Sequence, residues 1–378
     1  MASKKKDEII SEASPHTIKK FELIEAYSEA WAHKLLEYGL RTGNCNGIVF
    51  IDCMSNSGMY KEKGTENLVE GTPIRVARKL AATMREANYQ NQQAWLYFND
   101  LDPKKIEELE KHLPPNTHNF HIETSVRDGN ELLKDIGKQL NTQLKINYLL
   151  VYDPYEAAID WSALLPFIRN WGEVIINHMV SDSIRAVSQA TRPQTISKYE
   201  QTYLTRIEEL IDFGSDRFAF EQRIQDIIIE IKGTDAKRYY IASYPFFNTQ
   251  NTVVYNLLHC TSSKVGFGLY KSTAWKTFGG KSSLKRTVFG PGQLAMSLEP
   301  GVEELQLTAA EDENCYYIDN IVEFIINTFS GRVDVPLKEV WDAVDEHPIF
   351  PSDLFKNDIK DKLKERGYKI HRSSIDFT

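Results

Sequence analysis

The feature that most constrains the fold is an alternation of short apolar runs with amphipathic helical segments between residues 47 and 179. The runs, rich in β-branched and aromatic residues, are GIVFID (47–52), AWLYFND (94–100), HNFHIETS (118–125), INYLLVYDPY (146–155) and EVIINHM (173–179). Between them, apolar residues recur at helical spacing. Strands that alternate with helices in this way form a parallel sheet with helices on both faces.

The next part of the chain adds a helical insertion and a hairpin. Residues from about 191 to 232 are patterned as helices only. Two β-rich runs follow, RYYIASYPFFN and NTVVYNLLHC, joined by a short turn, which predicts an antiparallel hairpin. A mostly parallel α/β sheet closed by a late antiparallel hairpin is the outline of a class I methyltransferase-like (Rossmann-like) domain.

We therefore predict three parts, which are an N-terminal tail and helix (1–44), a methyltransferase-like domain that contains the insertion (45–298), and a C-terminal module (299–378). The first fourteen residues carry lysines with no apolar run behind them, so we expect a solvated tail. The C-terminal part holds three helical segments and a short β-prone run, YKIHR. This succession predicts a winged-helix-like module.

Composition excludes several classes of protein. The four cysteines lie far apart without a CxxC pair, which gives neither a zinc ribbon nor a disulfide framework and favours a cytoplasmic location. No apolar run is long enough to cross a membrane. The net charge of −8 leaves only a local patch for binding a polyanion. No His-rich metal motif is present, so we predict no metal site.

Polar residues at predicted strand ends are the candidates for binding a cofactor, because ligands of such sheets bind beyond the carboxyl ends of the strands. Asp52 and the turn after it, with Ser55, Asn56 and Gly58, could hold the amino-acid part of S-adenosylmethionine, the turn through its backbone amides. An ordinary strand–helix connection is the alternative.

Two further acids could complete that site. Asp100 ends the second run, where such folds grip a ribose, and Asp102 could do so too or could only cap the helix that begins at Pro103. Asp128 could bind the adenine edge, although Asp-Gly is equally a turn signal.

Asp153, Pro154 and Tyr155 follow the most apolar run and are the candidate catalytic residues. They resemble the D-P-P-Y box of amino methyltransferases, in which the acid and a proline carbonyl accept from an exocyclic amine and the aromatic ring stacks on the base. This chain has one proline where the box has two. The alternative is that Pro154 only stiffens the end of a strand.

The stretch 259–298 contains no aspartate or glutamate, and its cations are interleaved with aromatic residues. Cations that meet phosphates and rings that stack on bases are typical of nucleic-acid binding. We therefore name Lys264, Lys271, Trp275 and Lys276 as candidate contacts to nucleic acid. The alternative is that the rings belong to the core and the lysines are solvated.

Several motifs together resemble the three-Cys-motif partner protein family over roughly residues 15–290. In chain order they are Lys19-Lys20, YSEAW, FIDCMSNSGMY, EGTPIRVA, VYDPYEAAIDW, INHMVSDSIR and TSSKVGFGLYKSTAWK. The resemblance implies a methyltransferase-like fold, a bacterial or phage-associated source, and a three-Cys-motif protein as a possible partner. The family usually has glycine where Asn56 stands, and an added side chain there can block the approach of a cofactor.

These observations lead to one main hypothesis and two alternatives. The main hypothesis is an S-adenosylmethionine-dependent methyltransferase that acts on nucleic acid. The first alternative is a non-catalytic nucleic-acid-binding partner on a degenerate methyltransferase fold, favoured by the altered glycine loop and the single proline. The second is a metal-dependent nuclease in which Asp52, Asp100 and Asp153 would bind Mg²⁺.

Overall fold

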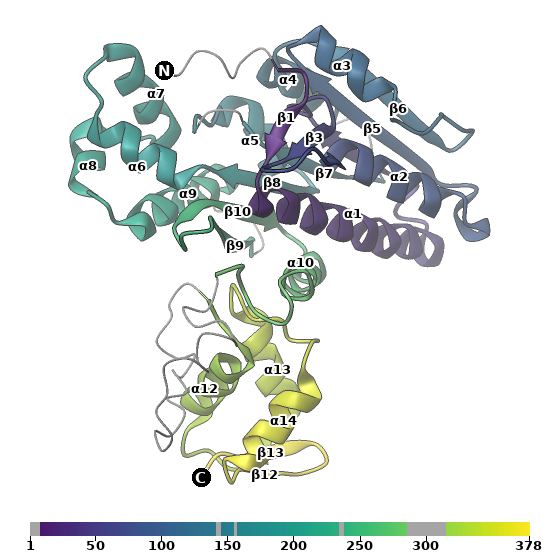
Figure 1. Ribbon diagram of the computed structural model, residues 1–378. Helices are drawn as coiled ribbons and strands as arrows, with labels where there is room; N and C mark the ends of the chain where they lie inside the picture. Colours follow the sequence, from purple (N-terminus) through teal and green to yellow (C-terminus); the bar gives the residue numbers. More distant parts are fainter. Residues whose placement is uncertain (1–7, 141–144, 155–156, 234–237, 286–314) are drawn as a thin grey trace.

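The computed structural model describes residues 8–140, 145–154, 157–233, 238–285 and 315–378 (Figure 1). At its centre lies a seven-stranded sheet. Its strands, in spatial order, are β6 (Phe120–Val126), β5 (Gln93–Asp100), β2 (Gly47–Asp52), β7 (Ile146–Tyr152), β8 (Glu173–His178), β10 (Val253–Thr261) and β9 (Tyr240–Phe247).

The directions of the strands confirm the predicted outline. β6, β5, β2, β7 and β8 are parallel neighbours, whereas β10 runs antiparallel to both β8 and β9. The five parallel neighbours have the doubly wound order 3-2-1-4-5 in chain sequence. The fold is thus α/β with a mainly parallel sheet that ends in an antiparallel hairpin.

Both faces of this sheet are covered by helices, which explains why the central strands carry apolar side chains on both faces. In β2, Ile48 and Phe50 belong to one buried cluster, whereas Val49 and Ile51 belong to the other, because successive side chains point to opposite faces. The first cluster includes residues of α1 (Pro15–Thr42), α2 (Thr72–Met84), α3 (Pro103–Glu110) and α10 (Lys264–Thr277). The second includes residues of α4 (Gly129–Leu140), α5 (Trp161–Arg169), α6 (Val180–Ser188), α7 (Pro193–Tyr203), α8 (Ile207–Asp212) and α9 (Arg217–Lys232).

The helix ends follow local rules that are visible in the sequence. α1 begins with Pro15 after Ser14, whose side chain accepts a hydrogen bond from the amide of Thr17, and it ends at Gly43 in the left-handed conformation. The predicted helical insertion is present as α7, α8 and α9, with α6 before it. None of the helices in the described ranges is long and apolar enough to cross a membrane.

The expectation of a solvated N-terminal tail is wrong for residues 11–13. They form strand β1 (Ser11–Ala13), which pairs in parallel with β3 (Met59–Glu62), and β3 pairs with β4 (Leu68–Glu70). Ala13 is fully buried. A three-residue strand is too short to show the alternation by which strands are recognised in a sequence, so only its partner in the 53–71 connection reveals it.

The C-terminal part contains the three predicted helices, α12 (Ile318–Phe329), α13 (Leu337–Glu346) and α14 (Lys356–Glu365). A small sheet joins them, with strands in the order β11 (Val335–Pro336), β13 (Ser374–Asp376) and β12 (Lys369–Ile370). The predicted boundary between 298 and 299 lies outside the described residues. In Figure 1 this part lies below the large sheet, with α10 between the two.

The junction with α10 corrects two of the predicted nucleic-acid contacts. Trp275 is fully buried, and its Nε1 donates to the carbonyl of Ile349 over 2.9 Å. Lys271 is also fully buried, and its Nζ donates to the carbonyls of Asp345 and His347 over 2.7 and 2.8 Å. These side chains join the C-terminal part to the sheet domain, so the prediction that they contact nucleic acid is wrong.

The other two predicted contacts remain accessible. Lys264 forms an ion pair with Asp345, with 3.2 Å between nitrogen and oxygen. Lys276 is exposed. The structure therefore partly explains why the stretch 259–298 is basic, because lysines of this stretch contact acids and carbonyl groups of the C-terminal part.

We predict that Trp275→Ala lowers the free energy of unfolding by about 3–5 kcal/mol, because it removes a core ring that packs near Phe350 and Phe355. Urea denaturation measures this loss. Lys276→Ala, one residue further along the same helix, is the control and should change stability by no more than about 0.5 kcal/mol. A Trp275→Ala protein as stable as the control would contradict the core assignment.

Candidate functional site

A cavity of about 920 Å³ lies outside the carboxyl ends of β2, β5, β6 and β7. This is where the strand order reverses, which is the usual ligand position in doubly wound sheets. Its lining residues are Glu8, Ser11, Cys53, Met54, Asn99, Asp100, Leu101, Asp102, Lys105, Asp128, Gly129, Asn130, Tyr152, Pro154 and Ala158. The volume falls in the range of about 300–1,000 Å³ that is typical of small-molecule sites.

Asp100 lies at the end of β5, is almost fully buried and lines this cavity. Its Oδ2 accepts a hydrogen bond from the amide of Asn56 over 3.1 Å, and its Oδ1 accepts from the amide of Asp102 over 3.0 Å. Asp100 therefore ties the turn after β2 to the end of β5. The side chain of Asp102 accepts from the amide of Lys104 and caps α3, as the alternative for that residue predicted.

Asp128 also lines the cavity and is exposed. Its Oδ1 accepts hydrogen bonds from the amides of Asn130 and Glu131, over 2.9 and 3.0 Å, at the start of α4. The expectation that Asp128 and Gly129 form a turn is thus correct. Its second carboxylate oxygen takes no part in these two bonds, so the cap does not prevent Asp128 from also meeting a ligand.

The turn after β2 adopts the backbone of a glycine loop although one glycine is missing. Asn56 has φ +58° and Gly58 has φ +70°, both in the left-handed region, which asparagine tolerates better than most residues. A Cβ at Gly58 would lie 2.6 Å from Leu109 Cδ1, so a larger residue would need that side chain to shift and would also strain the backbone at φ +70°. Asn56 thus has a backbone conformation that glycine also adopts.

This turn is nevertheless covered rather than open. Ser55, Asn56 and Gly58 are buried and are not among the residues that line the cavity. The amide and hydroxyl of Ser55 both donate to the carbonyl of Asn99, over 2.8 and 3.1 Å. The residues predicted to hold the amino-acid part of a cofactor are therefore covered in this structure, whereas Cys53 and Met54 before them line the cavity.

Asp52 and Asp153 lie side by side behind the cavity, at the ends of the neighbouring strands β2 and β7. Burial, together with the negative charge of Asp153, raises the pKa of the Asp52 carboxyl to about 7. Asp153 Oδ1 accepts from Asn177 Nδ2 over 2.5 Å, and its Oδ2 forms an ion pair with Lys20 of α1. Tyr155, the third predicted catalytic residue, lies outside the described residues.

The carboxylates at the strand ends do not form a metal site. In the described ranges, no group of three or more His, Cys, Asp or Glu side chains is arranged to hold a metal ion. Asp52, Asp100 and Asp153 instead meet backbone amides, an asparagine amide and a lysine.

Several lining residues escaped the sequence analysis. Met54 and Leu101 are apolar residues directly after strand ends, and Leu101 is 70% exposed, which is unusual for a large apolar side chain. Their position next to the polar candidates was a signal that could have identified them. Glu8, Ser11 and Lys20 had no such signal, because the N-terminal segment reaches the site only through the tertiary fold.

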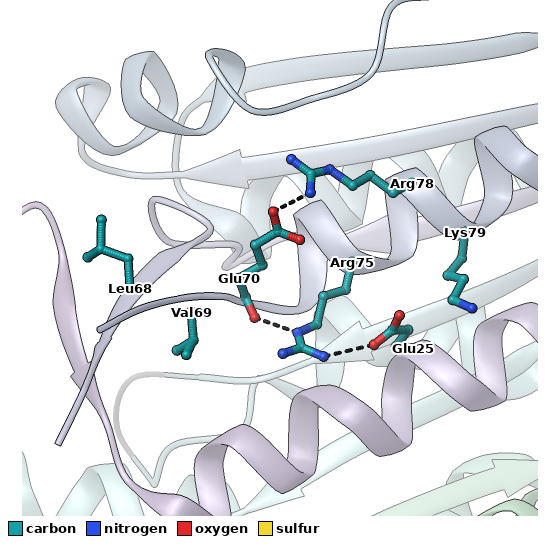
Figure 2. A pocket seen from close by; sticks show the side chains of 7 residues that line it. All are labelled: Glu25, Leu68, Val69, Glu70, Arg75, Arg78 and Lys79. Carbon is teal, nitrogen blue, oxygen red and sulfur yellow. Dashed lines mark hydrogen bonds and ion pairs between the residues drawn. The ribbon is translucent and has the colours of Figure 1, made fainter. Parts of the chain in front are cut away.

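A second cavity, of about 490 Å³, lies between α1, β4 and α2 (Figure 2). Its cations are paired with protein groups. Arg75 Nη1 contacts Glu25 at 2.9 Å, its Nε donates to the carbonyl of Glu70, and Arg78 pairs with the Glu70 carboxylate. These ion pairs fasten α2 to α1 and β4, so the cavity has a structural explanation.

Fold and cavity together define the class of this protein as a doubly wound α/β protein with a ligand-sized cavity at its switch point. No protein-family model matches the chain, and no curated protein matches it.

Three solved structures are similar to parts of the chain. A Legionella pneumophila protein of the family model DUF519 is 15% identical with a TM-score of 0.36, covering 68% of this chain and 91% of that one. A SAM-dependent methyltransferase from Anabaena variabilis is 8% identical (TM-score 0.26; 62% and 94%). Loganic acid methyltransferase with SAH is 9% identical (TM-score 0.25; 70% and 85%). Because all three TM-scores lie below 0.5, these likenesses carry no conclusion about activity.

We predict that Asp52→Asn makes the protein more stable than the wild type at pH 8 but not at pH 4. A carboxyl whose pKa is raised by folding contributes stability below its unfolded pKa of about 4, and that contribution is lost as the pH rises through about 7. Asparagine cannot ionise, yet it can still accept the hydrogen bond from the Met54 amide.

Urea denaturation across this range measures the effect. The difference in unfolding free energy between variant and wild type should grow by roughly a few kcal/mol from about pH 4 to pH 8. A difference that is constant with pH would show that Asp52 ionises as freely in the folded as in the unfolded chain.

Proposed function

We propose that this protein binds S-adenosylmethionine in the 920 Å³ cavity and transfers its methyl group to an amino group on nucleic acid. The observation that carries the proposal is the convergence of Asp100, Asp128 and Pro154 on that cavity at the switch point of the sheet. Each follows the carboxyl end of a different parallel strand.

The lining residues fit an adenosyl group. Asp100 lines the cavity at the end of β5, where an acid of such folds accepts a hydrogen bond from a ribose hydroxyl. Met54, Leu101 and Pro154 offer apolar surface to the faces of a base. Asp128 lies at the rim, where an amino edge could donate to it. When bound, the cofactor would supply an electrophilic methyl group.

Asp153 is the residue that we propose for orienting the acceptor. It lies beside the cavity, at the end of the central strand β7, and its side chain is partly exposed. In the D-P-P-Y box that Asp153-Pro154-Tyr155 resembles, the acid accepts a hydrogen bond from the acceptor amine. Asn177 holds one oxygen of Asp153 and so sets the orientation of the carboxylate.

We propose that the nucleic acid is bound by α14 and the β12–β13 hairpin, as the recognition elements of a winged-helix-like module. Charge is separated within the C-terminal part. Residues 334–346 hold five acids and one lysine, whereas residues 356–372 hold seven lysines or arginines and three acids. The acidic segment pairs with the sheet domain, through Asp345 to Lys264 and Glu346 to Arg238. In the basic segment Lys362 and Arg366 pair with acids of α12, and Lys364 pairs with Asp361. Lys369 and Arg372 are exposed and would meet phosphates.

The non-catalytic alternative keeps one supporting observation, which is that the turn at Ser55–Gly58 is buried. It differs from the main proposal only in turnover, because it retains the nucleic-acid surface. The chain's place among the three-Cys-motif partner proteins, and with it a three-Cys-motif protein as partner, stays a prediction from the sequence motifs.

We predict that S-adenosylhomocysteine binds the wild type in isothermal calorimetry and that Leu101→Ser weakens this binding about tenfold or more. Losing the contact of a leucine with a base costs about 1.5–3 kcal/mol, and 1.4 kcal/mol is a factor of ten in Kd. Val265→Ser is the matched control, since Val265 is similarly exposed but lies on α10. Absence of heat with the wild type, or equal weakening in both variants, would refute the assigned cavity.

We predict that Lys369→Ala/Arg372→Ala flattens the dependence of log K on log salt for nucleic-acid binding by about one to two units, at roughly 0.7–0.9 per phosphate contact. Both residues are exposed on the β12–β13 hairpin. Lys338→Ala, exposed on α13 and paired with Asp342, is the control and should leave the slope unchanged. If the double variant keeps the wild-type slope, the hairpin does not touch the phosphate backbone.

A further inference from the structure

Lys20 is a buried cation at the predicted catalytic acid. Its side chain extends from the first turns of α1, the residue is only 6% exposed, and its Nζ pairs with Asp153 Oδ2. Lys20 Nζ also lies 5.3 Å from the centre of the Tyr255 ring. With Asn177 on Oδ1, both oxygens of Asp153 are engaged by donors from the chain itself.

The segment that carries Lys20 covers the site. Glu8 and Ser11 line the cavity, and Ser11–Ala13 pair with β3. α1 then begins at Pro15 and brings Lys20 to Asp153 one and a half turns later. Residues 8–20 therefore reach both the cavity and the acid beside it.

The neighbouring groups leave Lys20 and Asp153 as each other's principal ionic partners. His16 is close to Tyr255, and burial together with the charge of Lys20 lowers the pKa of its imidazole to about 4, so it is neutral near pH 7. Asp52, on the other side, has its pKa raised to about 7 by burial. The Asp153 side chain is 29% exposed, so its carboxylate would lose stabilisation if Lys20 left without a replacement donor.

A group that replaces Lys20 at Asp153 must therefore also donate a hydrogen bond to Oδ2. The acceptor amine in our proposed function would do so, and it cannot bind there while the ammonium of Lys20 is in place. The side-chain amine of Lys20 thus occupies the position beside Asp153 that the acceptor amine would take.

We propose that Lys20 occupies the acceptor position and that a nucleobase bearing an exocyclic amino group binds by displacing it from Asp153. This inference rests on the proposed function. It adds one step to that function, the release of Lys20 from Asp153, which must occur before an acceptor binds. It also states which bases are preferred, because adenine and cytosine present an exocyclic amino group to Asp153, whereas thymine offers only its ring N3–H as a donor.

The test is the chemical reactivity of Lys20, read by mass spectrometry after brief treatment with an amine-acylating reagent. In the free protein Lys20 should react about tenfold or more slowly than the exposed Lys276, because reaction requires local opening. Lys271, equally buried and held by two carbonyls, is the matched control that should stay protected throughout.

The probes are single-stranded oligodeoxyadenylate, oligodeoxycytidylate and oligothymidylate of equal length, at concentrations that saturate binding, with S-adenosylhomocysteine present. Adenine and cytosine carry an exocyclic amino group and thymine does not. We expect Lys20 to become reactive with deoxyadenylate or deoxycytidylate and to stay protected with thymidylate. Protection with all three, or equal exposure with all three, would overturn the proposal.

Two variants give independent readouts. Asp153→Asn should expose Lys20 in the free protein by removing its ionic partner. Lys20→Met, which keeps the length of the side chain without its charge, should tighten binding of the amine-bearing oligonucleotide several-fold, because the competitor is gone. If Lys20→Met weakens that binding, Lys20 supports the acceptor instead of competing with it, and the proposal is wrong.

Calorimetry with S-adenosylhomocysteine distinguishes failure of the Lys20 displacement from failure of the proposed function. Binding of S-adenosylhomocysteine by the wild type with Lys20 protected under all conditions would remove the displacement step alone. No binding of S-adenosylhomocysteine would remove the proposed function, whatever the reactivity of Lys20.

Discussion

The constraint on which the structure depends is that the central strands are buried on both faces. β2 lies between β5 and β7, and helices cover the sheet on each side, so Ile48 to Ile51 contact only protein. Such a strand carries mostly apolar side chains along its length. Asp52, Asp100 and Asp153 stand at or directly after the carboxyl ends of parallel strands. Because those ends meet at one edge of the sheet, the three acids lie there together.

Acids that lie close together at a buried edge disfavour one another's charged forms. Each of the three acids is accommodated by different neighbouring groups. Burial raises the pKa of Asp52 to about 7, so this carboxyl stays largely protonated below that pH. Asp100 accepts two backbone amides and fastens the turn at Asn56. Asp153 forms an ion pair with Lys20 of the N-terminal helix α1. The arrangement of the site follows from these three separate solutions.

The sequence predicted the strands and their directions well, because period and composition are local properties. It was less successful with Lys271 and Trp275, where lysines and aromatic rings without acids indicated a nucleic-acid surface. The same composition also suits a junction, since the buried lysine meets carbonyl groups of the C-terminal part and the ring fills its core. The acids of α13 that pair with this helix lie about 80 residues away, and no local pattern connects the two.

By itself, the sequence determined the mainly parallel sheet, its closing hairpin, the acids at its strand ends and the three C-terminal helices. These depend on periodicity, on apolar runs and on the residues that begin and end helices, all of which act over a few neighbours. Only the tertiary structure decided that the turn at Asn56 is covered, that Ser11–Ala13 form a strand and that Lys20 meets Asp153. Each of those is a contact between distant segments, and its energy depends on burial that exists only after the chain has folded.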